Sequence, residues 1–165
     1  MLVQKMHQIL ISILTRRKNN MSKVEEFLSK EEEQEIISAI RIAEKNTSGE
    51  IRVHIEATAD KKHYNRALEV FNLLEMQHTK DANAVLIYVA VKDKKFVIYG
   101  DKGIHKVVPE NFWDSTKDAM QNHFKNNEFK QGIVKGILTA GKELQVHFPW
   151  QTDDIDELSN DISKG

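Results

Sequence analysis

The sequence of 165 residues contains no cysteine. A chain without cysteine forms no disulfide, offers no thiolate nucleophile, and builds neither a cysteine-ligated zinc site nor an iron–sulfur cluster. This absence excludes the cysteine-dependent phosphatases as a class. The seven histidines show neither the HxxxH nor the HExxH spacing that places two imidazoles on one face of a helix for zinc.

The sequence also lacks an excess of charge of one sign and any long apolar run. Its formal net charge is −1, whereas binding to phosphate backbones needs a basic excess or a basic face, so we expect no nucleic-acid partner. No segment approaches the roughly 18 consecutive apolar residues of a transmembrane helix. We therefore expect no membrane span.

Residues 1–22 are interpreted as a disordered or amphipathic extension. The apolar run Ile9 to Leu14 is followed by Arg16, Arg17 and Lys18, whereas a secretory signal has its basic residues before the apolar run. A weak membrane-surface anchor is the alternative. The segment that begins at Met21 could start the chain in its own right, so we expect residues 1–20 to be dispensable. Without a signal pattern or a span, we expect a cytoplasmic location.

The stretch 84–101, AVLIYVAVKDKKFVIYGD, is typical of a β-hairpin. Its first arm, 84–91, has no polar residue, which predicts a central strand covered on both faces. The second arm, 95–100, would run antiparallel to it. A chain of this length forms one domain with a substantial core, and we place that domain at residues 23–150.

Helices and one further strand surround the hairpin in the sequence. The capping box Ser29 to Glu32 predicts a helix over 30–46, and the alternation in 51–58 predicts a strand. A helical apolar stripe between that strand and the hairpin gives a βαβ unit, whose two strands should be parallel. One more helix should begin near Pro109, and a last helix should cover about 129–146. Three glycines in the last helix would let it approach the sheet: Gly132, Gly136 and Gly141. The predicted fold is a three-layer α/β/α sandwich around a small mixed sheet.

This topology brings several oxygen-bearing side chains to one edge of the sheet. The beginnings of two parallel strands and the end of their antiparallel neighbour share an edge, and the next helix begins there too. The candidate ligands are Glu50, Asp81, Asn83, Asp101 and Asp114. Carboxylates and an amide oxygen suit Ca²⁺ or Mg²⁺ rather than zinc. The alternative is that these residues only cap helices and turns.

Residues 151–165 are acidic and poor in helix formers, so we expect a mobile acidic tail. Asp154 and Asp156 resemble the paired aspartates of phosphoaspartate phosphatases, but no strand precedes them to fix a nucleophile. The tail also lacks the glycine and the terminal glutamate of an EF-hand loop. We interpret these carboxylates as solvated.

Four ordered motifs resemble the TPM domain family, which includes thylakoid-lumen acid phosphatase-like and photosystem-repair proteins. They are 47–51 (TSGEI), 81–87 (DANAVLI), 96–104 (FVIYGDKGI) and the spacing of Phe129, Gly132 and Gly136. The resemblance implies an α/β/α sandwich, divalent-cation binding, commonly of Ca²⁺, in a crevice at the sheet edge, and a phosphatase activity claimed for plant members. By motif position, Asp101 carries over most directly as a ligand.

Three functions follow as hypotheses. The first is a Ca²⁺-binding domain, with Mg²⁺ as the other candidate ion. The second is a metal-dependent phosphomonoesterase, in which Asp101 and Glu50 hold the metal and Lys102 or His105 contacts a phosphate-containing ligand. The third is a metal-free interaction scaffold. We expect a monomer in each case.

Overall fold

The computed structural model describes residues 2–165, and among these the side chains of all but residues 2, 3, 7, 17 and 19–23. Its sheet has four strands in the order β3-β2-β1-β4, with bounds β1 (Glu50–Glu56), β2 (Ala84–Ala90), β3 (Lys95–Gly100) and β4 (Ser163–Lys164). Strands β1 and β2 are parallel, and β2 and β3 are antiparallel. The predicted βαβ unit and hairpin are thus confirmed, whereas β4 had no signal in the sequence.

Strand β2 is buried along its whole length, as its uninterrupted apolar sequence predicted. Because successive side chains of a strand point to opposite faces, Val85, Ile87 and Val89 join one core cluster. Leu86 and Tyr88 join a second cluster on the other face. Each face of the sheet therefore needs its own cover.

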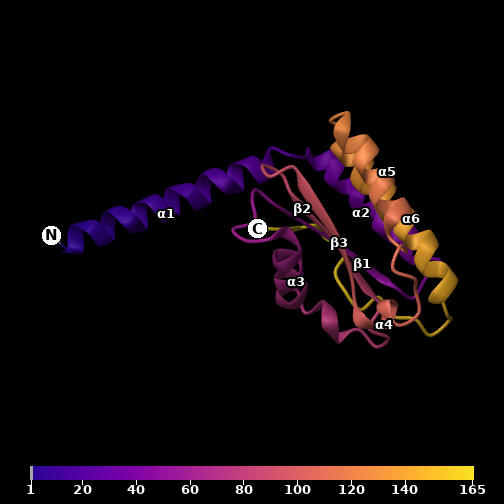
Figure 1. Ribbon diagram of the computed structural model, residues 1–165. Coiled ribbons are helices and arrows are strands. Elements are labelled where there is room, and N and C mark those ends of the chain that lie inside the picture. Colours follow the sequence, from indigo (N-terminus) through magenta and orange to yellow (C-terminus); the bar gives the residue numbers. More distant parts are fainter. Residues whose placement is uncertain (1) are drawn as a thin grey trace.

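Helices supply that cover on both faces, which confirms the α/β/α arrangement (Figure 1). One face packs against α2 (Lys30–Glu44), α5 (Asp114–Lys125) and α6 (Phe129–His147), and the other packs against α3 (His63–Leu73). The capping box that opens α2 is present as predicted. Two short helices, η1 (Met76–His78) and α4 (Lys102–His105), lie in the connections before β2 and after β3.

The glycines of α6 allow close packing between helices rather than against the sheet. A Cβ atom at Gly136 would lie 2.5 Å from the sulfur of Met120 on α5, and one at Gly141 would lie 2.8 Å from the Cβ of Ala43 on α2. Our expectation that these glycines face the sheet was therefore wrong. The apolar side chains Ile133, Ile137 and Leu144 of the same helix fill the space above the sheet instead.

The amino-terminal segment forms one helix, α1 (Leu2–Glu25), which extends away from the sandwich (Figure 1). Of its described side chains, only that of Val24, near its end, joins the core. Among residues 2–165, no helix is both long enough and apolar enough to cross a bilayer.

The carboxy-terminal tail lies against the sheet, where we expected a mobile segment. Leu158 packs against the cluster on the α3 face and Ile162 against the cluster on the opposite face. Ser163 and Lys164 then pair in parallel with His54 and Ile55. Two isolated apolar residues and a two-residue strand leave no periodic signal in an acidic sequence, which is why the tail looked solvated.

Candidate metal centre

Strand register places two of the predicted ligands on one edge of the sheet. Glu50 pairs with Ala84 in β2, and the backbone N–H of Asp101 donates to the carbonyl of Ala84 at 2.9 Å. Glu50 and Asp101 therefore lie two strand spacings apart, about 10 Å between Cα atoms. The shared edge inferred from topology is present.

Asp101 and Asn83 are both buried and both keep one oxygen without a partner. Oδ1 of Asp101 accepts a hydrogen bond from the N–H of Lys102 at 2.7 Å, which caps α4. The Nδ2 group of Asn83 donates to Oγ of Ser48 at 3.3 Å. The remaining oxygens, Oδ2 of Asp101 and Oδ1 of Asn83, are buried and accept nothing from the described residues.

The other two predicted ligands are exposed. Asp81 lies in a turn before β2. Its backbone oxygen is so close to Gly103 that a Cβ atom at position 103 would lie 2.3 Å from that oxygen. Asp114 is the first residue of α5. The structure thus places Asp81 and Asp114 near the same end of the domain without burying their carboxylates.

A compact acidic cluster forms around Glu50 and includes residues that the sequence analysis did not select. Glu44 at the end of α2, Glu50 at the start of β1 and Asp156 in the tail each bring one carboxylate oxygen within 4.8 Å of the others. No other group of three such ligands occurs within the described part of the chain. We call these three residues the acidic cluster.

The acidic cluster lines an open cleft of about 250 Å³, together with Ser48 and Asn160. Glu50 is only 4% exposed. Its Oε2 atom and Oδ1 of Asn160 are buried, and neither has a hydrogen-bond partner among the residues that the structure describes. The amide oxygen of Asn160 only accepts, and so does Oε2 of Glu50 while that carboxylate is ionised, so a donor or a cation would satisfy both atoms.

Hydrogen bonds fix the acidic cluster in place. The N–H of Ile51 donates to Oε1 of Glu44 at 2.8 Å. The N–H of Glu157 donates to Oε1 of Glu50 at 2.9 Å, and Oε2 of Glu157 accepts from the N–H of Lys80 at 3.0 Å. The tail is thereby bound to β1 and to the loop that precedes β2, which holds Asp156 at the cleft.

Burial and repulsion change the protonation of the acidic cluster. Burial, with added repulsion from Glu50 and Asp156, raises the pKa of Glu44 to about 8. Burial and the nearby Asp156 and Glu157 raise the pKa of Glu50 to about 7. Three carboxylates this close cannot all be ionised at neutral pH without a compensating positive charge. A cation bound among them would supply that charge.

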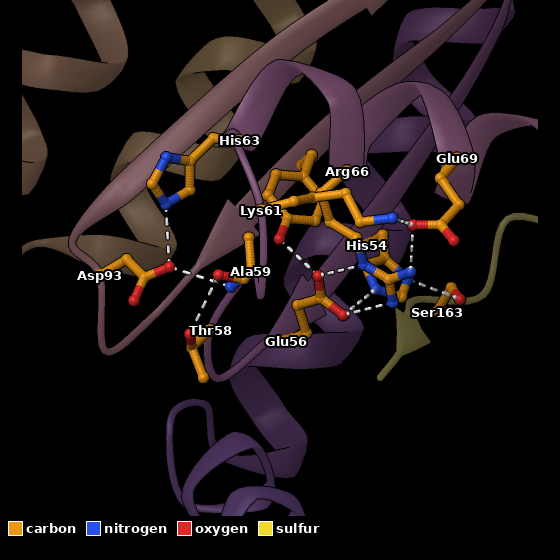
Figure 2. A network of polar contacts seen from close by, with 11 residues as sticks. His54, Glu56, Thr58, Ala59, Lys61, His63, Arg66, Glu69, Asp93 and Ser163 are labelled. Atoms are coloured by element: carbon orange, nitrogen blue, oxygen red, sulfur yellow. Dashed lines mark hydrogen bonds and ion pairs between the residues drawn. The ribbon is translucent and has the colours of Figure 1, made fainter.

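A second polar network lies on the α3 face of β1 and has the opposite character (Figure 2). Glu56 accepts two hydrogen bonds from Arg66, at 2.7 and 2.8 Å, and one from the hydroxyl of Tyr88. Although burial alone would raise the pKa of Glu56, the hydrogen bonds from Arg66, His54 and Tyr88 hold it at about 2. His54 also contacts Oγ of Ser163 through Nδ1 at 3.0 Å. This network satisfies its own charge, so we interpret it as structural.

The sequence analysis missed Glu44, Asp156 and Asn160. Glu44 looked like an ordinary helix-end residue, although the short turn 45–49 returns the chain directly to Glu50. Asp156 and Asn160 reach the cleft only because the tail folds back, and nothing in the local sequence indicated that.

Comparison with known proteins identifies relatives of the domain. A family model described as the TPM domain matches residues 21–143. The BA42 protein from the psychrophilic bacterium Bizionia argentinensis, solved by NMR, is 61% identical, with a TM-score of 0.82 over 87% of this chain and 99% of that one. None of the curated proteins compared with the chain matches it.

Two more distant NMR structures share the fold alone. The amino-terminal domain of a protein from P. gingivalis is 18% identical, with a TM-score of 0.62 over 74% of this chain and 79% of that one. The amino-terminal domain of the cg2496 protein from Corynebacterium glutamicum is 10% identical, with a TM-score of 0.57 over 84% and 81% of the two chains.

Proposed function

The chain belongs to the TPM domain family, and we propose that this member binds a divalent cation, Ca²⁺ in preference to Mg²⁺, at the acidic cluster. The observation that carries the proposal is the Oε2 atom of Glu50, which is buried with no partner among the described residues and belongs to a member of the acidic cluster. A bound cation would satisfy this oxygen and offset the repulsion among the three carboxylates.

The donor set favours Ca²⁺. Calcium takes six to eight oxygen ligands in flexible geometry, whereas Mg²⁺ demands a near-ideal octahedron and keeps several waters. The cleft offers three carboxylates, the amide oxygen of Asn160 and the hydroxyl of Ser48. Two of these side chains come from the tail, which can adjust its position more easily than a helix or a strand.

Asp101 and Asn83 remain candidate ligands at the same sheet edge because each has a buried oxygen without a partner among the described residues. Asp81 and Asp114 remain predictions from the sequence. Their exposed positions make outer, water-mediated contacts the natural contribution for these two carboxylates.

Calorimetric titration of Ca²⁺ into the chelator-treated protein tests the proposal. Glu50→Gln and Asp156→Asn should each weaken binding at least tenfold, because each removes a charged ligand while keeping the side-chain shape. Asp153→Asn is the matched control, because it removes the same charge from an exposed position outside the acidic cluster and should leave the affinity within about twofold. Equal loss in all three variants would indicate diffuse attraction instead of a site, and undiminished binding in Glu50→Gln would refute the assignment.

A metal-dependent phosphomonoesterase is the second candidate, favoured by the basic side chains Arg41 and Lys45 that line the same cleft. These two groups could bind the anionic oxygens of a phosphate ester beside the acidic cluster. A bound cation would act as a Lewis acid on the phosphoryl group and lower the pKa of a ligated water. Release of phosphate from p-nitrophenyl phosphate that requires Ca²⁺ or Mg²⁺ and falls in Glu50→Gln would support this function. Cation binding without phosphate release would identify the domain as a binding module. The absence of both cation binding and phosphate release would support the scaffold hypothesis.

A further inference from the structure

Helix α1 carries a stripe of large apolar side chains that nothing in the described structure covers. Its members lie three or four positions apart and are between 45% and 65% exposed: Met6, Ile9, Leu10, Ile13 and Leu14. At 3.6 residues per turn these positions fall within about 140° of the helix circumference. We call them the α1 stripe. Exposed apolar residues scattered over a surface need no explanation, but a continuous stripe does.

The α1 stripe points away from the sandwich. The opposite face of the helix lines a cleft whose other wall is formed by Thr58 and the hairpin turn, and its lining residues are Gln8, Ile11, Ser12, Thr15 and Arg16. None of the stripe residues lines that cleft. An amphipathic helix on a globular domain ordinarily buries its apolar face and exposes its polar face, whereas here the face turned toward the domain is polar except for Ile11.

The charge of the helix is of one sign. Residues 1–24 contain five basic residues and no acidic one, and the basic residues are Lys5, Arg16, Arg17, Lys18 and Lys23. By helical periodicity Lys5 lies beside the Ile9 border of the α1 stripe and Lys18 lies beside the Leu14 border. The apolar stripe is therefore flanked by Lys5 and Lys18, and by the same periodicity Arg17 continues its line one turn beyond Ile13.

The apolar surface and the positive charge together indicate what kind of partner covers the α1 stripe. Packing α1 against α1 of a second copy would bring two strongly basic helices together. A bilayer that contains anionic lipids offers both an apolar layer and negative charge, which is the environment that basic amphipathic helices enter. The helix is not apolar enough to cross a membrane. We propose that α1 binds in the plane of an anionic membrane surface, with the α1 stripe in the acyl boundary and its lysines at the headgroups.

This surface is independent of the cation site. The match to the TPM family begins at residue 21, so the α1 stripe lies outside the matched segment. Cation binding and membrane binding can therefore fail or succeed separately.

Vesicle co-sedimentation of the full chain tests the proposal in chelator. The chain should bind vesicles of phosphatidylcholine and phosphatidylglycerol, and binding should weaken with added salt and on vesicles of phosphatidylcholine alone. Ile9→Gln with Ile13→Gln should reduce the partition coefficient by roughly a hundredfold, because two side chains lose their apolar burial. Gln8→Ala with Ser12→Ala is the matched control on the opposite face and should bind like the parent.

The depth of α1 in the bilayer can be measured independently of vesicle binding. Because the chain has no cysteine, Leu10→Cys and Ser12→Cys each accept a single environment-sensitive dye. The dye at position 10 should shift to the blue on anionic vesicles and the dye at position 12 should not. No preference for anionic vesicles would overturn the proposal. So would a concentration-dependent dimer in ultracentrifugation that the Ile9→Gln and Ile13→Gln variant abolishes, since that result assigns the stripe to a second copy.

Discussion

Glu50→Gln should stabilise the cation-free protein and should gain less stability than the parent when Ca²⁺ is added. The raised pKa of Glu50 sets the sign of the first effect. The folded protein holds the proton of Glu50 up to about pH 7, whereas the ordinary value is 4.5. Above pH 4.5 the unfolded chain therefore binds fewer protons than the folded one, and stability falls as the pH rises.

The magnitude follows from the same two values. A difference of about 2.5 pH units corresponds to roughly 3 kcal/mol of stability lost between pH 4.5 and pH 8. Glutamine cannot ionise, and its amide oxygen still accepts the hydrogen bond from Glu157. The free energy of unfolding of the variant should therefore be about 1–3 kcal/mol higher than that of the parent at pH 8, which raises Tm by about 3–9 °C for a chain of this size. Below pH 4.5 the variant and the parent should have the same Tm.

Calcium should reduce this advantage. A ligand at one hundred times its Kd adds about 2.7 kcal/mol to the stability of the parent, whereas a variant that binds tenfold more weakly gains about 1.4 kcal/mol at the same concentration. Circular dichroism melts at pH 4 and pH 8, with chelator and with Ca²⁺, measure all four states. A variant that melts below the parent at pH 8 in chelator would refute the electrostatic reasoning, and an equal Ca²⁺ shift in both proteins would refute the site.

Four further results are expected. Cation affinity should rise from pH 5 to pH 8, because binding displaces protons from two glutamates whose pKa values are about 7 and about 8; calorimetry in two buffers of different ionisation enthalpy measures the released protons. Ca²⁺ should slow proteolysis within residues 151–165, with cleavage elsewhere unchanged as the control. Arg66→Leu should cost about 3–5 kcal/mol in urea unfolding by leaving Glu56 without its buried partner, whereas Glu69→Gln, which removes only the exposed partner of the same arginine, should cost under about 1 kcal/mol. Removal of residues 1–20 should leave Tm within about 2 °C, and a larger fall would show that α1 supports the core.

The sequence was sufficient to predict the first three strands of the sheet because their signals are local. The apolar run 84–91, the charged turn after it and the alternation in 51–58 each fix one element, and the handedness of crossover connections fixes their order. The edge that gathers Glu50, Asn83 and Asp101 follows from that order without any tertiary information. The extent of the acidic cluster does not, because Asp156 reaches it through packing of Leu158 and Ile162, and isolated apolar residues in an acidic segment carry no periodicity.

The two ends of β1 show why the acidic cluster differs from an ordinary buried carboxylate. Glu56 at one end is 5% exposed and Glu50 at the other is 4% exposed, yet only Glu56 has an arginine within hydrogen-bond distance. Burying an unpaired carboxylate is costly, and the acidic cluster places two more carboxylates beside Glu50.

The tail connects these two ends, since Glu157 binds Glu50 and Ser163 contacts His54. Asp156 would hold the tail more tightly when a cation occupies the cleft, and the tail in turn completes the ligand set. Cation binding and tail docking should therefore be coupled, so that each favours the other by the same free energy. A variant such as Leu158→Ser, which weakens tail packing without removing a proposed ligand, should lower Ca²⁺ affinity and speed proteolysis of the tail. Full Ca²⁺ affinity in a chain whose tail is already cleaved would show that Asp156 is not a ligand.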